Sequence, residues 1–158
     1  MGNSTGVSLE TDRQAKWDRR FLEMAKLVST WSKDPSTKVG AVIVDDVRII
    51  SLGYNGFAQA MPDVSEHYED RDEKLSRIVH AEANAIMLAH TSVRSMTIYV
   101  HPFMPCDRCA VQVIQAGIKR VLAPLPTDAQ NQRWGKHFEK SRRYFAESGV
   151  ILLEVSAP

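Results

Sequence analysis

The stretches His80-Ala81-Glu82 and Pro105-Cys106-Asp107-Arg108-Cys109 determine how the rest of this chain is interpreted. The first provides an imidazole and a carboxylate two residues apart, and the second provides two thiols three residues apart. A zinc ion with three protein ligands keeps its fourth tetrahedral position for water, as a catalytic site requires. The metal lowers the pKa of that water to roughly 7, and a carboxylate outside the coordination sphere can move protons. The sequence therefore predicts a catalytic Zn²⁺ site, with His80, Cys106 and Cys109 as ligands and Glu82 as the proton shuttle.

Two other interpretations of the cysteine pair explain less of the pattern. The chain has only 2 cysteines, fewer than a secreted disulfide scaffold needs. A redox dithiol would leave His80 and Glu82 without a role, and a structural zinc site usually takes four ligands. His67 is a candidate for a further ligand, but a lone loop histidine is more often solvated. The catalytic interpretation is therefore favoured.

Composition and charge describe an ordinary globular protein. With 158 residues, 44% of them hydrophobic and 25% charged, we expect one domain over residues 1–158. The net charge of +1 gives no broad basic field, so nucleic acid is not an expected partner. No apolar run approaches ~20 residues, and the polar N-terminus lacks a signal-like apolar core. We therefore expect a cytoplasmic protein that does not contact a membrane.

The N-terminal part predicts a disordered lead over residues 1–10, followed by a long amphipathic helix. Thr11 and Gln14 match a capping box, and Pro35 closes the helical region. One apolar stripe follows the helix at Trp17, Phe21, Met24, Val28 and Trp31. Such spacing indicates a helix face packed against a core.

The remainder alternates short apolar strands with helices. Strands are predicted at residues 39–44, 48–53, 96–100, 119–123 and 150–155. Helices are predicted to start at about residue 70, to span 81–89 and 107–116, and to run from a capping box at Thr127 to about residue 148. The first two strands form a hairpin, and the small residues Gly40 and Ala41 indicate a close backbone approach. The pattern predicts a three-layer α/β/α domain with a five-stranded mixed sheet, in which strands four and five are parallel. The helix starts that carry the metal ligands should meet at the carboxyl edge of this sheet.

Two further features have more than one interpretation. Asn55, between Tyr54 and Gly56, could occupy a left-handed turn or point its amide into a pocket. A basic cluster on the last helix could touch a phosphate or nucleic acid, although a solvated helix face is the more common explanation. The cluster consists of Arg133, Lys136, Lys140, Arg142 and Arg143.

Over roughly residues 17–155, the chain resembles the cytidine and deoxycytidylate deaminase superfamily, and most closely its dCMP deaminase branch. The histidine, glutamate and cysteines described above match the signature of zinc deaminases. The similarity also rests on the segment 34–44, on Gly53-Tyr54-Asn55-Gly56, on 80–86 and on 114–118.

The resemblance implies hydrolytic removal of the 4-amino group of dCMP, which gives dUMP and ammonia. Activated water would attack C4 while Glu82 protonates N3 and then the departing amine. By family similarity, Asn55 would bind the sugar and Ala81 would offer its backbone to the base. Thr37 and Lys38 lie where family members contact the nucleotide, and a monophosphate substrate requires a cationic or amide-lined pocket. Relatives usually form dimers or hexamers, so a homo-oligomer is expected.

The sequence departs from the family at several positions. His101 stands where many relatives have a small hydroxyl residue, and Phe103 precedes the metal loop, so both can reshape the base pocket. The C-terminal third, with Arg133 and Trp134, lacks the tyrosine-rich tail of the best-known members. The alternatives are therefore a deaminase of a modified deoxycytidylate, a deaminase of a base in nucleic acid such as tRNA adenosine, and a non-catalytic zinc-binding protein. The presence of Glu82 argues against the last of these.

Overall fold

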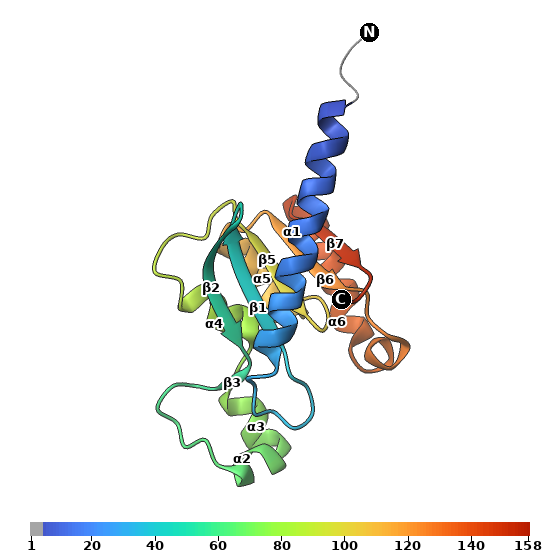
Figure 1. Cartoon of the computed structure of the whole chain (residues 1–158). Coiled ribbons are helices and arrows are strands. Elements are labelled where there is room, and N and C mark those ends of the chain that lie inside the picture. Colours follow the sequence, from blue (N-terminus) through green and yellow to red (C-terminus); the bar gives the residue numbers. More distant parts are fainter. Residues whose placement is uncertain (1–4) are drawn as a thin grey trace.

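The computed structural model describes the backbone of residues 5–158 and the side chains from residue 11 (Figure 1). In chain order the elements are α1 (Thr5–Ser29), β1 (Gly40–Asp45), β2 (Arg48–Tyr54), β3 (Gly56–Phe57), α2 (Ser65–Glu69), α3 (Arg71–Arg77), β4 (Ile78–Val79), α4 (Ala81–Met87), β5 (Thr97–His101), α5 (Asp107–Gln115), β6 (Arg120–Pro124), α6 (Asp128–Ser148) and β7 (Ile151–Val155). Within the described residues, no helix has both the length and the apolar character needed to cross a membrane.

The main sheet has five strands in the order β2-β1-β5-β6-β7. The β1–β2 hairpin and the β1–β5 pair are antiparallel, whereas β5–β6 and β6–β7 are parallel. The predicted hairpin, the mixed sheet and the parallel fourth and fifth strands are therefore confirmed. A separate pair, β3 with β4, was not predicted from the sequence; it connects the end of the hairpin to the residues just before His80.

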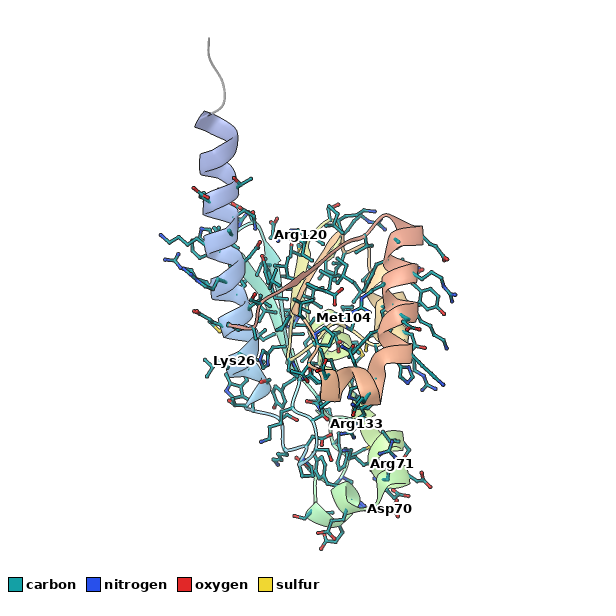
Figure 2. The ribbon with its side chains drawn as sticks, turned by 90° about the vertical axis from the view of Figure 1, so that its right-hand side faces the viewer. Lys26, Asp70, Arg71, Met104, Arg120 and Arg133 are labelled. Carbon is teal, nitrogen blue, oxygen red and sulfur yellow. The ribbon has the colours of Figure 1, made fainter. Side chains whose placement is uncertain are left out.

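Helices cover both faces of the sheet, as the side view shows (Figure 2). On one face, buried residues of α1 such as Phe21 and Val28 pack against Val42 and Tyr99 of the sheet. On the other face, α4, α5 and α6 contribute Ala85, Val113 and Phe145 to a second core cluster with Ile43 and other sheet residues. Alternate residues of the three central strands β1, β5 and β6 thus face opposite cores, which is the period-two pattern of a strand buried on both sides.

Two glycines allow helices on opposite faces to approach the hairpin. A Cβ atom on Gly40 would overlap the carbonyl oxygen of Ala25 in α1, and one on Gly53 would overlap the carbonyl oxygen of Ala81 in α4. The predicted close approach at Gly40 is confirmed. At Gly53, the same contact fixes the start of α4, which carries the predicted metal ligand and proton shuttle.

The N-terminal helix differs from the prediction at both ends. It begins at Thr5 instead of after a capping box at Thr11, so the expected disordered lead does not extend over residues 5–10, while residues 1–4 lie outside the described part. It ends at Ser29, and Trp31 is 50% exposed instead of continuing the buried stripe. The prediction was wrong here because the apolar spacing continues past the point where the backbone leaves the helix for the loop before β1.

A partly buried ion pair joins α1 to β6. The guanidinium of Arg120 donates hydrogen bonds of 2.8 and 2.6 Å to the two carboxylate oxygens of Asp18, and the Tyr99 hydroxyl donates a third of 2.6 Å. Burial alone would raise the pKa of Asp18, but the hydrogen bonds from Arg120, Tyr99 and Gln14 outweigh it and lower the pKa below its ordinary value. The charged form of Asp18 therefore stabilises the attachment of α1 to the sheet.

We expect Asp18→Asn to reduce the free energy of unfolding by about 2 kcal/mol at neutral pH, because charge-assisted hydrogen bonds in a partly buried site are lost. The folded-state pKa lies below the unfolded value, so this contribution is present above pH ~4 and disappears as the pH falls through the folded pKa. Urea unfolding at pH 7 and in acid measures it. The control is Asp46→Asn, which breaks an exposed 4.0 Å pair with Arg13 and should change stability by under ~0.5 kcal/mol. Equal effects of the two variants would contradict this account.

Candidate metal centre and its cavity

The three predicted metal ligands lie together at two helix starts. His80 is the N-cap of α4, Cys106 is the N-cap of α5, and Cys109 lies in the first turn of α5. The His80 Nδ1 atom is 3.6 Å from Cys106 Sγ and 3.3 Å from Cys109 Sγ, and all three donor atoms lie within 4.8 Å of one another. Tetrahedral zinc with ordinary Zn–N and Zn–S bonds requires N···S separations of roughly 3.5 Å. The donor set therefore fits a zinc ion.

The protonation of the two thiols also suits a metal. A hydrogen bond with the Cys109 thiol, followed by one with His80, lowers the pKa of Cys106 to about 4. The same hydrogen bond raises the pKa of Cys109, which therefore holds the proton shared by the pair. Divalent metals bind thiolates and neutral imidazoles, so binding here displaces the proton of Cys109 and competes with the proton of His80, whose pKa the contact with Cys106 raises.

Glu82 lies directly beside the donors but is not one of them. It occupies the first turn of α4 and is only 4% exposed. Burial is the main cause that raises the pKa of Glu82, and the nearby Cys106 thiolate adds to it. A carboxyl group with a raised pKa can both accept and release a proton near neutral pH, which is the property of a general acid–base group.

Two of the donors, His80 and Cys106, line a cavity together with Glu82; it holds about 760 Å³ of empty space, part of it continuous with solvent. The walls come from the loop before β1, from α3, from the starts of α4 and α5, and from the first turns of α6. Its lining residues are Asp34, Thr37, Val39, Asn55, Arg71, Lys74, Leu75, Ile78, His80, Ala81, Glu82, Phe103, Cys106, Arg133, Trp134 and Phe138.

The predicted substrate-binding residues are not all in this cavity. Thr37, Asn55 and Ala81 line it, whereas Lys38 lines a neighbouring hollow with Pro102 and Gln130. Phe103, one of the positions at which the sequence departs from the family pattern, lines both the cavity and the neighbouring hollow. The structure thus brings most of the predicted site residues together and leaves Lys38 at the side.

The sequence left two interpretations of Asn55 open, and the structure excludes the left-handed turn. It is 6% exposed and its φ is not in the left-handed region. Its amide oxygen accepts a 2.8 Å hydrogen bond from the Val39 N–H, and its amide nitrogen donates a 2.9 Å bond to the Thr37 carbonyl. The side chain therefore fixes the loop before β1 while lining the cavity.

Sequence reasoning did not identify the ion pair that supports the cavity wall. Lys74 Nζ lies 3.0 Å from Asp34 Oδ1, and their side chains are only 12% and 4% exposed. The same Asp34 oxygen accepts the backbone N–H groups of Ser36 and Thr37. Asp70 lies one helical turn before Lys74, but it caps α3 through the N–H groups of residues 72 and 73. The contact spans 40 residues of sequence, so no local pattern reveals it.

Helix α6 holds the cysteine loop in place. The buried Ser141 hydroxyl donates a 2.8 Å hydrogen bond to the carbonyl oxygen of Pro105, next to the first metal ligand. His137 Nδ1 lies 2.7 Å from a carboxylate oxygen of Asp107, the residue after that ligand. One helix thus contacts the residues on both sides of Cys106, the backbone of Pro105 and the side chain of Asp107.

We expect Ser141→Ala to lower the free energy of unfolding by about 1 to 2 kcal/mol, because it leaves the buried Pro105 carbonyl without a partner. Zinc affinity should fall as well, since the cysteine loop loses one of its supports. Urea unfolding and zinc competition with a chromogenic chelator measure the two effects. The matched control is Ser148→Ala, whose hydroxyl bonds only to Phe145 of its own helix. Unchanged zinc affinity in Ser141→Ala would contradict this role.

Comparison with known proteins identifies the family of this chain. Residues 15–124 match the family model of the cytidine and deoxycytidylate deaminase zinc-binding region. An uncharacterized deaminase encoded in the luxG 3′ region of Aliivibrio fischeri is 43% identical over 136 residues, which cover 86% of this chain and 91% of that protein. A probable deoxycytidylate deaminase of Caenorhabditis elegans is 42% identical over 72% of this chain, and the match spans only 59% of that longer protein.

The fold matches as well. The crystal structure of the dCMP deaminase from the cyanophage S-TIM5 in apo form superposes with a TM-score of 0.69 over 89% of this chain and 98% of that one, at 22% identity. The three-layer fold expected from the sequence is thereby confirmed. With the matched family model and the His–Cys–Cys donor set beside a buried glutamate, the chain belongs to the cytidine and deoxycytidylate deaminase family, whose zinc-binding region it carries.

Proposed function

We propose that this protein is a zinc-dependent deaminase that hydrolyses dCMP to dUMP and ammonia. The observation that carries the proposal is the position of the buried Glu82 beside the His80–Cys106–Cys109 donor set, at the wall of one open cavity. The choice of dCMP as substrate is supported by the C. elegans relative, which is named a probable deoxycytidylate deaminase. The matched segment includes the donors, the glutamate and Asn55.

The residues of the site have two chemical roles, metal binding and proton transfer. His80, Cys106 and Cys109 would hold Zn²⁺, which when bound activates a water molecule for attack at neutral pH. Glu82 accepts the proton that the water loses and delivers it to N3 of the cytosine ring. It then transfers a second proton to the amino group at C4, which leaves as ammonia. One water is consumed, and the C4–N bond is replaced by a C4–O bond.

The remaining residues orient the nucleotide. The position of Asn55 in the cavity wall points to a role in binding the sugar, and the backbone at Ala81 adjoins both the metal donor and the proton shuttle. Thr37 lies in the loop that Asn55 and Asp34 hold in place. We propose that the apolar wall formed by Val39 and Phe103 contacts the base and limits the access of bulk water.

The direct test is product analysis on the zinc-loaded protein with a panel of substrates. The panel contains dCMP, CMP, deoxycytidine, 5-substituted dCMP and an adenosine-containing tRNA stem-loop. The proposal predicts dUMP and ammonia from dCMP, at a kcat/KM well above that for deoxycytidine. Activity on the stem-loop alone, with a steep salt dependence, would contradict it and support action on nucleic acid. Preference for a 5-substituted nucleotide would keep the reaction and change the substrate.

A further inference from the structure

We propose that Arg71 of α3 and Arg133 of α6 form the clamp that recognises the 5′-phosphate of the nucleotide. This inference rests on the proposed function, because only a nucleotide substrate needs such a group. Neither residue belongs to the motifs that carry the family resemblance, and Arg133 lies beyond the segment matched by the family model. The structure assigns both to the same cavity as the metal donors.

Both arginines bring positive charge that nothing in the described chain neutralises. From residue 11 onward, where side chains are described, neither guanidinium forms an ion pair with a carboxylate. The Arg133 guanidinium lies 4.8 Å from the centre of the Trp134 ring, a contact that orients the group and leaves its charge in place. Guanidinium groups bind phosphate through two parallel hydrogen bonds, so two free arginines at one cavity suit a dianion.

The other cations nearby are less suitable. The charge of Lys74 is neutralised by Asp34, to which it is bound at 3.0 Å in a nearly buried position. Moving Lys74 toward a ligand would also release the loop that Asp34 holds. Lys38 lines the neighbouring hollow and not the cavity that contains the metal donors. Among the side chains described from residue 11 onward, this leaves Arg71 and Arg133 as the two cations that line the cavity and remain free for a ligand.

The placement of the two residues fits recognition at the far end of a nucleotide from its base. Figure 2 shows Arg133 at the end of α6 nearest to α3, with Arg71 on α3 just below it. The metal donors and Glu82 come instead from the starts of α4 and α5. The proposed reaction requires the cytosine ring to lie against these donors and Glu82. A nucleotide therefore places its base near the donors and its phosphate between α3 and α6.

The experiment compares the zinc-loaded wild type with Arg71→Gln and Arg133→Gln on two substrates that differ only in the phosphate. For dCMP we expect kcat/KM to fall about 10- to 100-fold in each variant, the loss expected for one charge-assisted contact. For deoxycytidine we expect no change. The matched control is Lys136→Gln, which removes an exposed positive charge from the same helix outside the cavity and should change neither value.

A binding measurement separates this inference from the proposed function. Calorimetry on the same proteins compares dUMP with deoxyuridine, which requires no turnover. If the wild type does not deaminate dCMP, the proposed function fails. The clamp is still supported if both arginine variants lose affinity for dUMP and keep their affinity for deoxyuridine. Equal losses for the two ligands, no loss for either, or wild-type affinity that is the same with and without the phosphate would each overturn the clamp.

Discussion

Replacing Glu82 by glutamine is expected to lower kcat for dCMP at least ~10²-fold, the scale of general acid–base catalysis. The amide has nearly the same shape as the carboxyl group but cannot carry a proton from the water to N3 and then to the amine. Glu82 is 4% exposed, and burial raises its pKa, so the site already disfavours the charged form. A neutral side chain should therefore fit without loss of stability. Steady-state ammonia release measures kcat, and metal analysis should find the zinc content unchanged.

The control for this variant is Glu147→Gln. Its carboxylate is 67% exposed and belongs to a loose 3.8 Å pair on α6, so turnover should stay at the wild-type level. A Glu82→Gln protein that binds zinc and dCMP normally and deaminates at the wild-type rate would show that the proton shuttle is assigned to the wrong group.

Gly53→Ala is expected to have the second-largest effect, because β2 and α4 touch at this residue without room for a side chain. The new Cβ would overlap the Ala81 carbonyl oxygen and lie 2.5 Å from the Ala85 backbone nitrogen. The helix must move away, and with it His80 and Glu82. We expect a loss of about 3 kcal/mol in unfolding free energy, the upper end of the cost of overpacking, together with a loss of zinc affinity. Urea unfolding and zinc competition measure both.

Gly40→Ala provides the matched comparison on the opposite face of the sheet. The clash there is of the same kind, with the Ala25 carbonyl oxygen and, at 2.5 Å, the Ser29 nitrogen, but it displaces α1, which carries none of the proposed site residues. It should destabilise the fold to a similar extent while zinc affinity in the remaining folded protein is retained. The same zinc affinity in the two variants would contradict the claim that Gly53 positions α4.

The sequence predicted those parts of the molecule whose signals are local. The capping box of Thr127 and Gln130 at α6 is present with both hydrogen bonds, and Gly149 ends that helix in the left-handed conformation. The histidine and the two cysteines each stand at or just after a helix start, so their spacing alone predicted the donor set. These features depend on backbone groups within a few residues, which is why a single sequence reveals them.

The parts that were not predicted depend on contacts between distant residues. Lys74 pairs with Asp34 and not with its helical neighbour, and Asp18 pairs with Arg120 across 102 residues. Trp31 continued the apolar spacing of the first helix but became exposed because the helix stops at Ser29. In each case the outcome depends on tertiary structure, which the residues nearby in the sequence do not specify. The roles of individual residues toward the substrate remain predictions for the experiments above.

The central claim is that dCMP is deaminated at the His80–Cys106–Cys109 centre with the help of bound zinc. The most direct measurement strips the protein with a chelator and then adds zinc in steps while dUMP formation from dCMP is followed. The account predicts that the stripped protein is inactive and that the rate rises in proportion to added zinc, levelling off at about one ion per chain. A stripped protein that keeps the full rate, or a zinc-saturated protein that forms no dUMP, would contradict it.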